Sequence, residues 1–160
     1  MRIDLDRDYC ECGAAIVCAL QLNTRPGLEF RNCRVQLAWS AVGGRYQSRI
    51  VKTELNLTQE LAQKISYRRE LNFGIPEDGP ITVDCDFDDQ LLQSSSGRMV
   101  PVFALFKRTK ARFPLNKYPI QISWEIRAEV TFKDQSKQIL KAFFGVLPIN
   151  SLQLLKQSEI

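Results

Sequence analysis

The sequence predicts an all-β protein, an antiparallel β-sandwich with at most one or two short helices. Three observations support this fold class. Apolar and polar residues alternate with period two over most of the chain, turn-forming residues separate the alternating segments at short intervals, and no glycine-rich phosphate loop joins a strand to a helix. With 160 residues, 44% hydrophobic and 25% charged, the chain suits one soluble domain that buries its own core.

The first half of the chain contains three clear alternating segments. Residues 16–22, 33–39 and 71–75 place apolar side chains at every second position, which is typical of a strand with one buried face. Asn, Pro and Gly at residues 23–27 and a Gly pair at residues 42–44 predict turns between them. Each segment is therefore expected to form a strand.

Residues 58–70 leave two alternatives open. Leu57, Leu61 and Ile65 would share one face of a helix. The β-branched Ile65 and the aromatic Tyr67 favour a loop followed by a strand equally well.

The second half of the chain has the strongest signal. Between residues 120 and 133, seven apolar residues alternate with seven polar ones. A strand of this length would run roughly 43 Å, so we expect it to bend or bulge. Shorter strands are predicted at residues 81–87, 99–106 and 140–146, and the predicted turns lie at residues 76–80, 94–97 and 133–136. We expect one domain at residues 1–148 and a short tail at residues 149–160.

The residue types present exclude much catalytic chemistry. The chain contains no His, so it has no Ser-His-Asp triad, no Cys-His pair and no His-ligated zinc of its own. No catalytic residue and no cofactor are expected. The first eight residues are too acidic for a signal peptide, and no segment approaches the roughly 20 apolar residues of a membrane-spanning helix, so the predicted location is the cytoplasm.

The 5 cysteines are expected to be reduced. Cys18 and Cys33 are in phase with apolar neighbours and behave as small core residues. Cys10 and Cys12 form a C-x-C pair, which leaves a thiol-sensor alternative open but lacks the second close pair that zinc sites usually show. Val83 stands two residues before Cys85, where an antibody-type sandwich has Tyr, so that disulfide-bonded type is excluded.

The net charge of +4 conceals two charged segments of opposite sign. All charged residues in the segment 77–89 are acidic, and Asp84, Asp86 and Asp88 occupy every second position there. They are candidate calcium ligands, although a solvated strand face explains them more simply and the spacing does not fit an EF-hand.

The basic segment, residues 98–117, carries no acidic residue. It is predicted to include a loop that binds an acidic or phosphorylated protein partner, with a solvated loop as the alternative. The candidate partner-binding residues are Lys107, Arg108, Lys110, Arg112 and Lys117. Too few aromatic residues accompany these cations for RNA binding, so no nucleic acid is expected. Asn56-Leu57-Thr58 matches a glycosylation sequon, to which we assign no function in a chain without a secretory signal.

The order of these features resembles the amino-terminal half of the arrestin family. The resemblance covers roughly residues 3–148 and rests on five segments: Tyr9-Cys10-Glu11-Cys12-Gly13 leading to residues 16–22, the strand at residues 33–37, the aromatic strand and proline loop at residues 71–80, the Trp-x-Ile-x-Ala-x-Val strand at residues 124–130, and the Phe-x-Val strand at residues 144–148. It implies an immunoglobulin-like sandwich without catalysis that binds proteins through its loops and sheet edges. Arrestins have two such domains and only one fits here, so the activation switch between their domains is not carried over.

The resulting expectation is a cytoplasmic adaptor or scaffold module that binds a protein partner. This functional expectation rests on likeness of fold. The alternative is a peripheral membrane module in which Asp84, Asp86 and Asp88 hold calcium against anionic lipid.

Overall fold

The computed structural model describes residues 1–43, 46–82, 91–93, 99–101 and 121–151. These residues form strands and one short helix. In chain order the elements are β1 (Arg2–Leu5), β2 (Tyr9–Glu11), β3 (Ala15–Asn23), β4 (Phe30–Gly43), β5 (Tyr46–Asn56), α1 (Thr58–Leu61), β6 (Ser66–Gly74), β7 (Leu91–Gln93), β8 (Met99–Pro101), β9 (Gln121–Phe132) and β10 (Lys137–Leu147).

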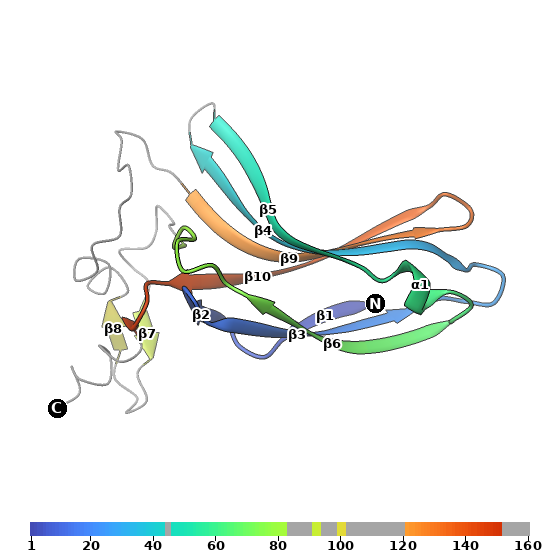
Figure 1. The fold of residues 1–160 in the computed structure, drawn as a ribbon, viewed down its shortest axis with the longest axis horizontal. Helices are drawn as coiled ribbons and strands as arrows, with labels where there is room; N and C mark the ends of the chain where they lie inside the picture. Colours follow the sequence, from blue (N-terminus) through green and yellow to red (C-terminus); the bar gives the residue numbers. More distant parts are fainter. Residues whose placement is uncertain (44–45, 83–90, 94–98, 102–120, 152–160) are drawn as a thin grey trace.

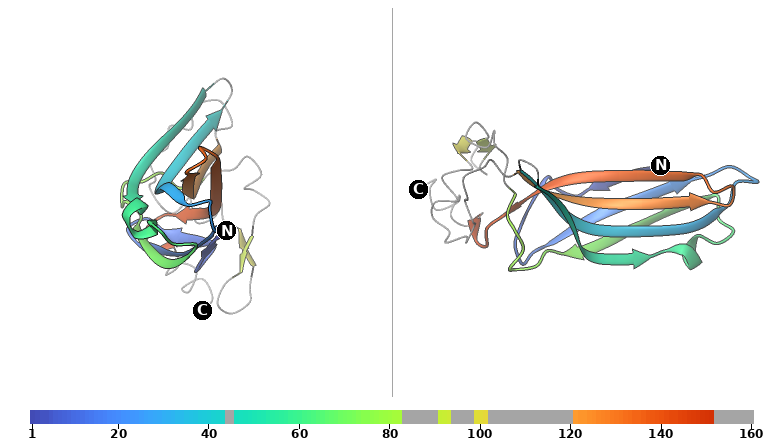
Figure 2. Two further views of the ribbon diagram at one scale, coloured as in Figure 1. Left: turned by 90° about the vertical axis from the view of Figure 1, so that its right-hand side faces the viewer. Right: turned by 90° about the horizontal axis from the view of Figure 1, so that it is seen from above.

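Two sheets lie one above the other (Figure 1). The smaller has the order β1-β3-β6, and the larger has the order β2-β10-β9-β4-β5. Long strands run side by side along the molecule, as Figure 2 shows from above. This arrangement confirms the predicted β-sandwich. One pair departs from the antiparallel expectation, because β2 runs parallel to β10 at Gly145–Leu147. Strands β7 and β8 pair with each other in a separate two-stranded sheet.

The core lies between the two sheets and follows the predicted alternation. In β3 every second residue is fully buried, and in β9 the even-numbered residues from Ile122 to Phe132 are all buried. Their apolar side chains leave water on folding, which provides the main stabilisation of a sandwich. The largest side chain with no exposed surface is Trp124 of β9.

The predicted bend of residues 120–133 is associated with irregular pairing. Strand β9 curves along its length (Figure 1), and the register shifts occur in the strands beside it, one in β4 and one in β5. Opposite β9 the register shifts between Phe30 and Asn32, so Arg31 is an extra residue there. Opposite β5 a second shift occurs between Leu37 and Ala38. Such bulges bend a strand and redirect its side chains.

The two alternatives for residues 58–70 are resolved in favour of a loop and a strand. Helix α1 is only Thr58–Leu61, and β6 begins at Ser66. Strands β1, β2, β5 and β7 were not among the segments predicted from alternation. A strand was also predicted at residues 81–87. The Thr82 N–H donates to the Val146 carbonyl, and the Val146 N–H donates to Thr82 Oγ1, but Thr82 belongs to no assigned strand. Residues 83–87 lie outside the described residues.

Within the described part of the chain, no helix has the length and apolar character needed to cross a membrane.

Candidate functional site

The candidate site residues predicted from charge lie outside the residues that the structure describes. These are the partner-binding candidates Lys107, Arg108, Lys110, Arg112 and Lys117 and the calcium candidates Asp84, Asp86 and Asp88. Both hypotheses therefore stay predictions, and the described residues offer other candidates.

The thiol-sensor alternative depends on how accessible Cys10 and Cys12 are. Both side chains are buried, and each Sγ donates a hydrogen bond to a backbone carbonyl: Cys10 to Ala15 at 3.5 Å and Cys12 to Gly79 at 3.5 Å. Burial raises the pKa of Cys10, and it raises the pKa of Cys12 to about 11. Because the thiolate is the reactive form, both groups are poor nucleophiles at neutral pH. Cys18 and Cys33 are completely buried, as predicted for core residues.

Alkylation of the folded protein by iodoacetamide at neutral pH should therefore be slow at these four cysteines, and urea should accelerate it strongly. Mass spectrometry of tryptic peptides after short exposures measures the rate at each cysteine. Rapid labelling of Cys10 or Cys12 in the folded protein, at a rate close to that in urea, would restore the sensor hypothesis.

Sheet edges form the second class of candidate, because an unpaired edge can accept another strand. Two long edges carry features that discourage such pairing. Strand β5 contains the irregularity opposite Leu37 and Ala38, next to the exposed Lys52. Strand β6 carries Arg69 on the same side as its buried residues. The Tyr67 hydroxyl donates a hydrogen bond to Glu60 of α1 at 2.7 Å, and Arg69 forms an ion pair with the same carboxylate. These two bonds hold the pKa of Glu60 below its usual value.

Strand β10 has an edge in regular register with β9, and its exposed charged residues are Lys137 and Lys141. Residues 137–144 pair with β9 on one side, and β2 pairs only with Gly145–Leu147, so the first part of β10 has one unpaired edge among the described residues. Strand β1 lies close to β10 but pairs with β3. The outer face of this segment presents Ile139, Lys141 and Phe143, and Ile139 is 48% and Phe143 60% exposed. We call residues 137–144 the free edge of β10.

The charges beside this edge are not balanced. Lys141 stands directly opposite Arg127 of β9, and like charges in opposing positions are unfavourable. Arg127 forms an ion pair with Glu129 at 2.9 Å, yet its buried Nε has no hydrogen-bond partner among the described residues. Lys141 has no ion-pair partner in the described part of the chain. An acidic group placed here would relieve the repulsion between Lys141 and Arg127.

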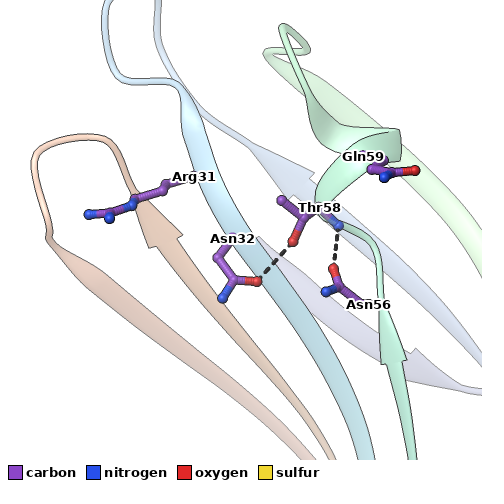
Figure 3. A pocket seen from close by; sticks show the side chains of 5 residues that line it. All are labelled: Arg31, Asn32, Asn56, Thr58 and Gln59. Atoms are coloured by element: carbon purple, nitrogen blue, oxygen red, sulfur yellow. Dashed lines mark hydrogen bonds between the residues drawn. The ribbon is translucent and has the colours of Figure 1, made fainter.

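A polar depression is the third candidate, and it has a volume of 660 Å³. All of its lining residues are polar: Arg31, Asn32, Asn56, Thr58 and Gln59. Figure 3 shows Arg31 and Gln59 at opposite ends, with the other three residues between them. Arg31 and Asn32 are consecutive residues of β4 that both line it, which the bulge at Arg31 permits by breaking the alternation of side chains.

Hydrogen bonds fix the middle of the depression. The backbone N–H of Cys33 donates to Thr58 Oγ1 at 3.2 Å, and the Thr58 hydroxyl donates to Asn32 Oδ1 at 2.8 Å (Figure 3). The Thr58 N–H donates to Asn56 Oδ1 at 2.9 Å. Both asparagine oxygens are therefore acceptors within the protein, and neither amide NH₂ group has an acceptor among the described residues.

The sequence contained partial signals for these two sites. The alternation at residues 140–146 predicted β10, but the apolar outer residues and the length of unpaired edge depend on how far β2 extends. The Asn56-Leu57-Thr58 motif was noticed only as a sequon. Nothing in the sequence indicated that it lies beside residues 31 and 32.

The two sheets, their connections and the absence of any long helix from the described residues define an arrestin-like β-sandwich domain. The solved structures with this fold include Spo0M, a sporulation control protein from Bacillus subtilis, which superposes with a TM-score of 0.54 at 11% sequence identity. The match covers 99% of this chain and 54% of the Spo0M chain, so this chain spans about half the length of that protein. Neither a protein-family model nor a curated protein sequence matches the chain. At this identity, the likeness establishes the fold alone.

Proposed function

We propose that this domain is a non-catalytic protein-interaction module that binds an extended, acidic segment of a partner protein along the free edge of β10. The incoming segment adds as a further strand, so its main chain bonds the unpaired N–H and C=O groups while its side chains meet Ile139, Lys141 and Phe143. An adaptor or scaffold role, and a location in the cytoplasm, are part of this proposal.

The observation that carries the proposal is the unbalanced charge beside an edge of β10 that pairs with no strand among the described residues. Lys141 opposes Arg127 and has no ion-pair partner within the described residues, and the exposed Ile139 and Phe143 flank it on the same strand. Alternation of apolar, basic and apolar side chains complements a strand that alternates apolar and acidic ones. The features of β5 and β6 that discourage pairing direct a partner strand toward β10.

Selection from a displayed library of random peptides about ten residues long tests this proposal. Peptides that bind the wild type should alternate acidic and apolar residues. Their affinity should fall about tenfold or more in the Lys141→Glu variant, because an attractive contact becomes repulsive. Backbone amide resonances of residues 137–144 should shift on binding in an NMR titration.

The matched control is Lys52→Glu, which makes the same charge change on the exposed side of β5. This variant should retain the affinity of the wild type. The Phe143→Ser variant separates the apolar contribution from the charge. Peptides that bind Lys141→Glu and Phe143→Ser as tightly as the wild type, or that shift resonances elsewhere, would place the binding surface outside β10 and contradict the proposal.

A further inference from the structure

The polar depression at Arg31 has a composition that favours one class of ligand. Four of its side chains can donate hydrogen bonds outward: the guanidinium of Arg31 and the amides of Asn32, Asn56 and Gln59. The acceptor oxygens of Asn32 and Asn56 are already bonded to Thr58. Each of these oxygens keeps a second lone pair, but the N–H donors outnumber the acceptors and one donor is a cation, which favours an anion as the ligand.

The charges around the depression leave Arg31 without compensation. On β4, Arg34 bonds Glu129 at 3.3 Å, and the nearby Glu29 forms an ion pair with Lys133. Arg31 forms no ion pair among the described residues, and its side chain is exposed. Figure 3 shows the Arg31 guanidinium directed away from the other lining side chains, but because this side chain is exposed it can turn toward the amide of Asn32, its neighbour at the bulge.

The middle of the depression is preorganised. Asn32 is held by the Thr58 hydroxyl, and Asn56 is held by the Thr58 backbone N–H, so both amides already have fixed orientations before a ligand arrives. Thr58 is itself fixed by the backbone N–H of Cys33. Fixed donors bind an anion with less loss of conformational entropy than mobile ones.

We propose that this depression is a binding site for an oxyanion, a carboxylate or phosphate group held by the fixed amides of Asn32 and Asn56, toward which the exposed guanidinium of Arg31 turns when the anion binds. The site is built from residues other than those of the β10 edge, so it stands or falls independently of the proposed interaction with an acidic strand.

An NMR titration with inorganic phosphate, and in parallel with acetate, tests the site in the full chain. The side-chain NH₂ resonances of Asn32 and Asn56 and the Arg31 Nε–H resonance should shift together and saturate. A stronger response to phosphate than to acetate would assign phosphate groups as the ligand, and the reverse would assign carboxylates. Glucose at the same concentrations should cause no shift.

The decisive variant is Asn56→Asp. Its carboxylate can still accept the bond from the Thr58 N–H, so the local fold is retained, but the free NH₂ donor becomes a negatively charged oxygen. The affinity for the anion should fall about tenfold or more. Asn72→Asp, at an exposed position of β6, makes the same change of charge elsewhere and should bind like the wild type.

Two results would overturn the proposal. One is equal binding by Asn56→Asp and the wild type, and the other is non-saturating shifts spread over the exposed basic residues of the protein. If Asn56→Asp fails to fold, Arg31→Gln tests the same site with an exposed side chain that has no ion pair among the described residues. Unchanged affinity in that variant would also contradict the proposal.

Discussion

Replacing Trp124 with alanine is expected to lower the free energy of unfolding by about 3–5 kcal/mol, the usual loss for a fully buried tryptophan. Trp124 has no exposed surface and lies against Phe144, with 6.3 Å between ring centroids. Its Nε1 donates a hydrogen bond to the Pro80 carbonyl at 2.6 Å. The indole also lies against Gly79, where an added Cβ would come within 3.1 Å of the ring. The substitution therefore leaves a cavity and also releases the turn at residues 76–80.

Urea denaturation of three variants separates these contributions. Trp124→Phe keeps an aromatic ring but leaves the Pro80 carbonyl without its donor, so a smaller loss of about 1–3 kcal/mol is expected. Trp39→Ala is the matched control, because Trp39 stands directly opposite Trp124 on β4 and is only partly buried, and its Nε1 has no hydrogen-bond partner among the described residues. Equal losses for Trp39→Ala and Trp124→Ala would show that the central position of Trp124 has no special importance.

The burial of Trp124 could be predicted from sequence because period-two alternation is a local property. Seven apolar residues in phase define one buried face without knowledge of the neighbouring strands. Trp39 is in phase with its own strand equally well, yet it is less buried. The alternation predicts which face of the sheet a side chain lies on. How deeply the side chain is buried depends on the elements that pack over that face.

Strand β5 illustrates where local reasoning fails. Thr53 pairs with Leu37, and the next pair joins Val51 to Ala38, so Lys52 interrupts the register. The interruption removes the alternation by which the other long strands were recognised. The same effect at Arg31 creates the polar depression, whose two halves belong to residues 31–32 and 56–59. The pairing of Arg34 with Asn56 brings them together, and pairing between distant segments is not visible in a single sequence.

The outer face of the larger sheet also contains a buried ion pair that no pattern indicated. Glu125 occupies a polar position in the alternation of β9, which predicted exposure, but its side chain is only 6% exposed. Arg49 of β5 donates to Glu125 at 2.8 Å through Nε, and to Gln36 at 3.1 Å through Nη2. Gln36 in turn donates to Glu54. The four side chains form one network across β4, β5 and β9.

Arg49→Met is expected to destabilise the protein by about 3–5 kcal/mol, because it leaves the Glu125 carboxylate buried without its opposite charge. The double variant Arg49→Met/Glu125→Leu removes both charges and should recover most of this loss, since an apolar pair avoids the cost of desolvating two ions. Urea denaturation of the wild type, both single variants and the double variant measures the coupling energy.

Arg68→Met, at an exposed position of β6, controls for the loss of an arginine and should change the free energy of unfolding by less than about 0.5 kcal/mol. Additive losses in the double variant would mean that the two charges do not stabilise each other, and the network would then be a consequence of sheet packing rather than a contributor to it.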